Sequence, residues 1–402
     1  MLNQNRLDPV VYLNSNDGTS IVAFGEGPKV KLNVGNALNQ LTDFLETHKG
    51  NYCFGYLGYD LKNEIEDLES NNRDYIGFPD LFFFRPKWVV KIYQKDINYV
   101  QGTPTSESDA FVSQYVNPNQ KSSNNTIRLE PLQSKEEYLK TIKVLKNHLQ
   151  RGDIYEVTYC QGFLAEQVTL DPLATYFKLN AKTIAPFSCF VSLGNRYLMS
   201  GSPERFLKRE GDKLISQPIK GTARRSSSPE EDQQNKENLL KSEKERAENV
   251  MIVDLVRNDL SRVAAMNSVS VEELFGVYSF KTVHQLISTI SAKQKPNTTF
   301  KELMHALFPM GSMTGAPKIS ALQLIEQHET FKRGLFSGAV GYVAPNGDFD
   351  FNVIIRSILY NASTKTVLCP VGGAITIQSD AQEEYNECLL KAAAMMQILD
   401  EK

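Results

Sequence analysis

The sequence predicts an α+β protein with large antiparallel sheets packed in layers and helices outside. Near the C-terminus, strand-like runs at residues 336–344, 348–360 and 366–377 are joined by Pro345-Asn346-Gly347 and by residues 361–365. Such short connections suit antiparallel hairpins and leave no room for the crossover helix of a parallel unit. No internal repeat is evident, so neither a solenoid nor a propeller is indicated.

The composition indicates a large globular protein with no strong bias of charge. The 402 residues include 44 Lys and Arg against 47 Asp and Glu, a net charge of −3. A near-neutral surface does not favour binding to nucleic acid or to an anionic membrane. No apolar run approaches the ~18 residues of a membrane span, and residues 1–6 lack the pattern of a secretory signal. We therefore expect a cytoplasmic protein that binds neither nucleic acid nor a membrane.

The first part of the chain is predicted to be rich in strands. Aromatic runs at residues 51–60 and 81–93 are bounded by Gly, Pro and Asn. A polar stretch at residues 117–126 has almost no apolar residue to bury and indicates a surface linker. We expect residues 1–116 to form one part of the protein and residues 127–402 another.

Helices and strands alternate after this linker. Apolar periodicity predicts strands at residues 155–163 and 187–200. The helical candidates are residues 136–150, 172–183, 230–256, 300–308, 317–328 and 382–399.

Lys220 stands at the end of an apolar strand, between Pro218-Ile219 and Gly221-Thr222. If its amine is buried, desolvation and a nearby cation would lower the pKa and leave a neutral nucleophile. The alternative is a surface lysine in a hairpin turn, because lysine is seldom buried without a cause.

Two helical patterns carry glutamates on the face that should be buried. Glu248 and Glu245 extend the apolar stripe of one helix, and Glu387 and Glu384 extend that of the last helix. Histidines are few and no Cys-x-x-Cys pair occurs, so a catalytic metal would be held by carboxylates, which favours Mg²⁺. The alternative is a pair of solvated faces with salt bridges to Lys241, Lys244 or Lys391.

Several further features could bind an anion or move a proton. The loop at residues 311–318 opens a helix whose free N–H groups suit an anion, and Gly372-Gly373, just after a strand, would let backbone approach a carboxylate. Arg356 interrupts an apolar strand and would need an anionic partner. The alternatives are that the two loops contain ordinary capping and turn glycines and that Arg356 faces outward. His284, which could be catalytic, could instead be a hydrogen-bonded residue of the core.

These segments together follow the order of motifs in a known family. The motifs are Ser202-Pro203-Glu204-Arg205-Phe206, Pro218-Ile219-Lys220-Gly221-Thr222, Ala247-Glu248-Asn249 with residues 254–260, residues 311–318, residues 338–342 and Ile355-Arg356-Ser357. They resemble the chorismate-utilising enzymes, among them anthranilate synthase component I, aminodeoxychorismate synthase component I, and isochorismate and salicylate synthases. The resemblance covers residues 130–400 strongly and implies the anthranilate-synthase-component-I-like fold. It also implies that residues 127–402 form the chorismate-binding catalytic domain, interlocked with the N-terminal part.

Within the family, Lys220 resembles aminodeoxychorismate synthase component I, since anthranilate synthases carry alanine there. By resemblance, the Lys220 amine attacks C2 of chorismate as the C4 hydroxyl leaves, and Glu204 donates a proton. Ammonia then adds at C4, displaces the lysine and gives 4-amino-4-deoxychorismate, the precursor of p-aminobenzoate and folate. The remaining matches are Glu248 and Glu387 as Mg²⁺ ligands with Glu245 and Glu384 beside them, His284 as a further catalytic residue, and Arg356, Ser312, Thr222, Gly372 and Gly373 around the substrate.

The resemblance also implies partners, and two positions depart from its pattern. Ammonia is expected from a glutamine amidotransferase subunit, because no cysteine lies in a Gly-rich nucleophile elbow. Residues 12–15 and 186–188 resemble the walls of a tryptophan pocket. Glu156 stands where the amination enzymes usually carry glutamine, and Phe336 replaces a tyrosine of the anthranilate synthases. The rival functions are anthranilate synthase component I and, more remotely, a non-catalytic protein that binds chorismate or tryptophan.

Overall fold

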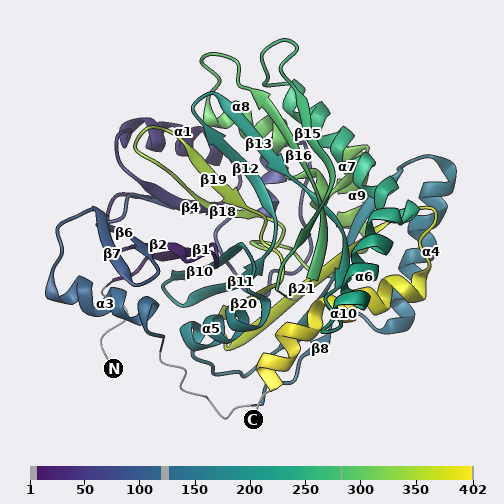
Figure 1. Ribbon diagram of the computed structural model, residues 1–402, viewed down its shortest axis with the longest axis horizontal. Helices are drawn as coiled ribbons and strands as arrows, with labels where there is room; N and C mark the ends of the chain where they lie inside the picture. Colours follow the sequence, from purple (N-terminus) through teal and green to yellow (C-terminus); the bar gives the residue numbers. More distant parts are fainter. Residues whose placement is uncertain (1–6, 119–125, 282, 401–402) are drawn as a thin grey trace.

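Two antiparallel sheets form the centre of the molecule, and helices lie outside them (Figure 1). The structure is a computed structural model that describes residues 7–118, 126–281 and 283–400. Within these residues, the eleven-stranded sheet has the order β17 (Gly315–Ala316), β9 (Glu156–Ala165), β21 (Thr366–Ile375), β20 (Ser357–Asn361), β11 (Arg196–Ser202), β10 (Phe187–Leu193), β1 (Val10–Asn14), β2 (Thr19–Phe24), β6 (Trp88–Tyr93) and β7 (Asp96–Gln101), and β8 (Glu130–Pro131) pairs with β9.

The ten-stranded sheet contains the other described strands. Its order is β14 (Ile219–Arg224), β16 (Val283–Lys293), β13 (Lys213–Gln217), β12 (Arg205–Glu210), β19 (Phe349–Asn352), β18 (Ala339–Val343), β4 (Cys53–Leu57), β5 (Leu81–Phe84) and β3 (Lys29–Leu32), and β15 (Ser270–Ser279) pairs with β16. The predicted α+β class with large antiparallel sheets and outer helices is confirmed.

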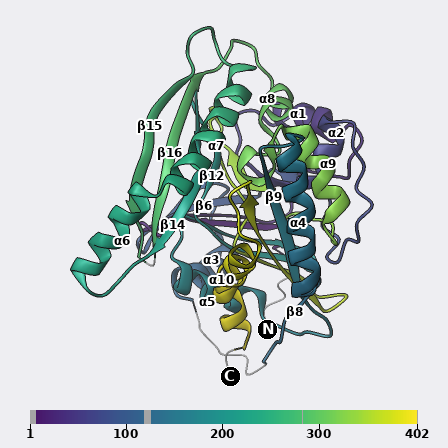
Figure 2. The same ribbon diagram turned by 90° about the vertical axis from the view of Figure 1, so that its right-hand side faces the viewer.

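The helices cover the sheets on both outer sides. They are α1 (Ala37–Thr47), α2 (Lys62–Ile65), α3 (Ser106–Val116), α4 (Lys135–Arg151), α5 (Pro172–Thr183), α6 (Pro229–Lys241), α7 (Glu243–Ser261), α8 (Phe300–Leu307), α9 (Lys318–His328) and α10 (Ala381–Asp400), with 3-10 turns η2 (Tyr59–Leu61) and η3 (Gly311–Met313). Figures 1 and 2 show α4, α6, α7, α9 and α10 on one side of the molecule. None of the helices in the described residues is both long enough and apolar enough to cross a membrane.

Strand alternation builds two cores on the two faces of the larger sheet. In β1, Val11 joins a cluster with residues of the smaller sheet, whereas Val10 and Tyr12 join a cluster with residues of α3, α4, α5 and α10. Successive side chains of a strand point to opposite faces, so one buried strand serves both cores. The result is a layered arrangement in which the larger sheet lies between the smaller sheet and these four helices.

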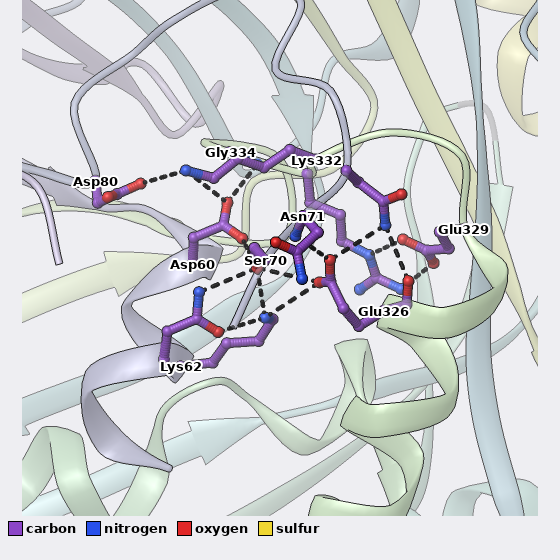
Figure 3. A network of polar contacts seen from close by, with 12 residues as sticks. Asp60, Lys62, Ser70, Asn71, Asp80, Glu326, Glu329, Lys332 and Gly334 are labelled. Atoms are coloured by element: carbon purple, nitrogen blue, oxygen red, sulfur yellow. Dashed lines mark hydrogen bonds and ion pairs between the residues drawn. The ribbon is translucent and has the colours of Figure 1, made fainter. Parts of the chain in front are cut away.

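Strands from the first 116 residues form one end of each sheet and pair there with later strands. β1 pairs with β10, with Val11 opposite Val191, and β4 pairs with β18, with Tyr56 opposite Val340. A polar network adds further links between the two predicted parts (Figure 3). In it, Asp60 accepts from Gly334 N–H at 2.9 Å. Of the predicted linker, residues 119–125 lie outside the described residues.

Two predicted elements are divided in the structure. The run at residues 348–360, predicted as one strand, is β19 in one sheet and β20 in the other, and Arg356 lies between them with a positive φ of 50°. The run at residues 230–256 is α6 followed by α7. Ser242 is extended between them, and its side chain accepts from Glu245 N–H at 3.3 Å, so it caps the second helix. The two breaks fix the positions of Arg356 and of Glu245 in α7, which are both among the candidate site residues.

Candidate functional site

A cavity of about 570 Å³ lies where the two sheets meet α7 and α10. It contains most of the residues that the sequence analysis selected. Those that line it are Glu204, Lys220, Thr222, Glu245, Glu248, Ser312, Arg356, Gly372, Gly373, Glu384 and Glu387. Residues far apart in the sequence are therefore brought to one place, as the motif pattern predicted.

Two crossings of the chain between the sheets form one wall of this cavity. Glu204 lies between β11 of the larger sheet and β12 of the smaller one, and Arg356 lies between β19 and β20. The crossings are held together because Val353 N–H donates to Glu204 O and Gly201 N–H donates to Arg356 O, each at 3.0 Å. Glu204 and Arg356 thus leave the strand ladders where their side chains can face the cavity.

Lys220 is aimed into the cavity by an irregularity in β14. Ile219 lies opposite Ile287 and Thr222 opposite Gln285, so β14 contains one more residue than its partner over this interval. Such bulges redirect side chains and are common beside active sites. Gly221 completes the bulge with φ of +86°, and a Cβ there would lie 2.9 Å from Glu245 Oε2.

The buried Lys220 amine is paired with a carboxylate. Its Nζ lies 2.5 Å from Glu156 Oε1, and the two side chains are 9% and 1% exposed. Burial alone would lower the pKa of Lys220, but Glu156, Glu248 and Glu204 raise it above its ordinary value. This direction is opposite to the lowering expected from burial and a nearby cation, and it favours the ammonium form paired with Glu156.

Burial favours the neutral, protonated form of the Glu204 carboxyl group. It is 5% exposed, and Ser312 Oγ donates to its Oε1 at 2.6 Å. Burial raises its pKa to about 7, although Ser312 and Lys220 oppose the shift. A buried acid of this kind can donate a proton to a leaving group near neutral pH.

The four glutamates of α7 and α10 face the cavity. Glu248 and Glu384 are buried, Glu245 and Glu387 are half-buried, and Glu248 Oε1 is buried without a hydrogen-bond partner in the described residues. Lys244 of α7 reaches Glu384 of α10 at 3.3 Å, and Lys391 binds Glu387 at 2.6 Å. The predicted alternative of solvated faces is therefore right about two salt bridges and wrong about the burial of Glu248 and Glu384.

The same glutamates suit a hard cation bound largely through water. Across the described ranges, no three His, Cys, Asp or Glu side chains are close enough to hold one metal ion. Mg²⁺ does not need such a cage, because it retains several waters and takes few protein carboxylates. Gly373 leaves room beside two of these carboxylates, since a Cβ there would lie 3.2 Å from Glu384 Oε2 and 3.9 Å from Glu387 Oε1. The donor set thus fits Mg²⁺.

A comparison with known protein families covers all the residues named above in the cavity. The family described as chorismate binding enzyme matches residues 8–397 of this chain. The chain belongs to the chorismate-binding enzymes. The match includes both predicted parts of the chain and every residue named above in the cavity.

Relatives within the chorismate-binding enzymes include proteins of two named activities. The chain is 33% identical to aminodeoxychorismate synthase component 1 of Escherichia coli, over 89% of this chain and 80% of that one. It is 35% identical to the chloroplastic aminodeoxychorismate synthase of Arabidopsis thaliana, over 85% of this chain but only 40% of the longer plant protein. The crystal structure of anthranilate synthase component I from Streptococcus pneumoniae is similar, with a TM-score of 0.82 and 26% identity over 94% of this chain and 92% of that chain.

One predicted catalytic residue of this chorismate-binding enzyme lies outside the cavity. His284 is buried on the other face of β16, where Nε2 is 3.0 Å from Asp232 Oδ1 and Nδ1 is 2.8 Å from Ser279 Oγ. Its neighbour Gln285 lines the cavity, and its Oε1 is buried without a partner in the described residues. A catalytic role for His284 is thus not supported by its position, because strand alternation presents the next residue instead.

The two predicted glycine loops also differ from expectation. Gly372 and Gly373 lie inside β21, opposite Cys160 and Tyr159 of β9, and so they do not follow a strand. In the other loop, Ser312 belongs to η3, and Pro317 caps α9 but is not in its first turn. Gly372 O accepts from Lys391 Nζ at 2.8 Å, and Ser312 acts through its hydroxyl on Glu204.

The predicted tryptophan segments are neighbours in the structure. β1 and β10 pair there, with Asn14 opposite Ser188. The ring of Tyr12 packs against Tyr115 and Tyr176 beside them. Tryptophan binding stays a prediction, as does the cytoplasmic location.

Proposed function

We propose that this chain aminates chorismate to 4-amino-4-deoxychorismate, as component I of an aminodeoxychorismate synthase. The observation that carries the proposal is the Lys220 amine, which the bulge in β14 aims into the cavity. Anthranilate synthases carry alanine at this position of the family motif. The relatives named aminodeoxychorismate synthase support the same branch.

The residues of the cavity can share the work of a two-step substitution. Lys220 attacks C2 of chorismate, a C2–N bond forms, the ring double bond shifts, and the C4–O bond breaks. The departing hydroxyl takes a proton from Glu204 and leaves as water. Ammonia then forms the C4–N bond, and the double bond shifts back as the lysine leaves C2. The net change replaces the C4 hydroxyl by an amine and releases one water.

Substrate binding is assigned to the cations and small residues of the cavity. Chorismate is a dicarboxylate, and the planar fork of Arg356 suits a carboxylate. The hydrogen bond that the described contacts give Arg356 is weak, from Nη1 to Lys391 O at 3.4 Å, so most of its donors remain available. Phe336 offers an apolar wall, consistent with a branch that retains the pyruvyl side chain.

Mg²⁺ would be held by Glu248 and Glu387, with Glu245 and Glu384 orienting its waters. When bound, the ion supplies positive charge opposite a substrate carboxylate.

The proposal for ammonia is an external source, a glutamine amidotransferase subunit. All five cysteines are buried, and burial raises the pKa of the Cys53 and Cys189 thiols to about 12, which does not suit a glutaminase nucleophile. The component 1 names of two bacterial relatives are consistent with a second subunit.

Product analysis tests the proposed branch. With chorismate, Mg²⁺ and ammonium, the protein should form 4-amino-4-deoxychorismate, which yields p-aminobenzoate only after a lyase is added. Fluorescent anthranilate and pyruvate appearing without a lyase would instead identify an anthranilate synthase, the function of a Thermus thermophilus relative that is 32% identical. Saturable chorismate binding without any product would indicate a sensor.

The acid role of Glu204 predicts the pH dependence of turnover. Because burial raises its pKa to about 7, the carboxyl keeps its proton below that pH and loses it above. We expect kcat/KM to fall about tenfold for each pH unit above neutrality. The Glu204→Gln variant should be much slower and should not show this decline. An unchanged decline in the variant would assign it to another group.

A further inference from the structure

We propose that Glu156 is the base that removes the proton from the Lys220 ammonium group and returns it after the lysine is released. This inference rests on the proposed function, because it concerns the same nucleophile. It gives a role to a carboxylate that stands where the amination enzymes usually carry an amide. The requirement is elementary: an ammonium nitrogen has no free electron pair and cannot attack carbon.

The contacts leave Glu156 as the acceptor in place. Its Oε1 lies 2.5 Å from Lys220 Nζ, within the range for direct proton transfer. Glu204 is bonded instead to Ser312, and no described hydrogen bond joins Lys220 to Glu248. Solvent is a poor substitute, because the Lys220 side chain is only 9% exposed.

The second oxygen of Glu156 has no competing hydrogen bond among the described residues. Its Oε2 is buried and has no hydrogen-bond partner in the part of the chain that the structure describes. Glu329 provides a contrast nearby. Its oxygens accept from Cys160 N–H and from two nitrogens of Arg333. Glu156 has Lys220 as its described ion-pair partner.

The proton movements balance over the cycle. The ammonium proton moves to Glu156, and the neutral amine forms the bond to C2 as Glu204 protonates the leaving hydroxyl. Ammonia then attacks C4, and the Lys220 amine leaves C2 with its electron pair. The released amine takes the proton back from Glu156. The new C4 nitrogen is an ammonium group, and Glu204 regains its proton from solvent. In sum, chorismate, ammonia and one proton give the protonated product and water.

The test measures the rate at which the Lys220 adduct forms, by rapid quenching and mass spectrometry, from about pH 6 to about pH 8. Glu156→Gln keeps the shape of the side chain and its hydrogen-bonding capacity but cannot take the proton. Glu248 and Glu204 still favour the charged form of Lys220 in this variant. The lysine must then lose its proton to solvent, so the variant should be slower at pH 6 by at least about a hundredfold. The ratio of wild-type to variant rate should fall about tenfold for each pH unit. Loss of protonated Glu204 cancels in this ratio.

The other groups whose charge acts on Lys220 are Glu204, Glu248, Glu245 and Glu387, and all are retained in the variant. Glu156→Asp, which keeps a carboxylate, should preserve the wild-type pH profile at a reduced rate. A purely structural role would lower the rate of Glu156→Gln by the same factor at every pH, and that result would overturn the inference.

If Glu156→Gln does not fold, the wild-type profile decides: a rate that declines above neutrality supports internal transfer, and a level rate contradicts it. A wild-type protein that forms no adduct would overturn the proposed function as well.

Discussion

Lys220→Ala should lower the formation of 4-amino-4-deoxychorismate by about a thousandfold or more, and no chorismate adduct should be detected at position 220. The reason is that the buried amine supplies the electron pair for the first bond. Mass spectrometry of the quenched protein and product chromatography measure the two effects.

Lys220→Arg is the matched control for charge. Arginine can retain the ion pair with Glu156 but does not act as a nucleophile, because it stays protonated. We expect it to be folded and as inactive as Lys220→Ala. Substantial turnover by either variant would show that the lysine serves only to place charge in the cavity.

The second large effect concerns the stability of the fold. Arg333 is 2% exposed and pairs with the equally buried Glu329. Its guanidinium donates to Thr158 O and Met313 O, each at 2.8 Å, and both residues line the cavity. Arg333→Ala leaves a buried carboxylate without its cation, so the free energy of unfolding should fall by about 3–5 kcal/mol.

Urea denaturation measures this change, with Arg257→Ala as the control. Arg257 forms an exposed pair with Asp254 on α7, and its loss should change the free energy of unfolding by less than about 1 kcal/mol. An equally small effect of Arg333→Ala would mean that solvent enters and replaces the lost contacts.

Periodicity and motif order were sufficient for much of the fold and of the site. The helix at residues 172–183 was predicted with the observed bounds, and the glutamates of α7 and α10 were placed on buried faces because a helix repeats in a known way. The division of residues 348–360 between two sheets could not be read from the chain, since one apolar run is compatible with either sheet. Only the assembled sheets show that Arg356 lies at a crossing.

The position of His284 outside the cavity has a similar origin. A motif locates a strand within a residue or so, but a shift of one residue moves a side chain to the opposite face. The partner of Lys220 was likewise hidden, because Glu156 in β9 and the lysine in β14 belong to different sheets and meet only in the assembled fold. Pairwise electrostatics such as this ion pair depend on contacts that no local pattern encodes.

The pairing of an early strand with a much later one has a consequence for biosynthesis. Tyr56 finds its neighbour in β18 only after Val340 has been made. At a ribosomal rate of about 5–20 residues per second, the buried strand Cys53–Leu57 must wait for many seconds before its partner β18 has been made. During that interval the edge that later binds β18 is unpaired, and an unpaired edge of an apolar strand is a site at which other nascent chains can associate.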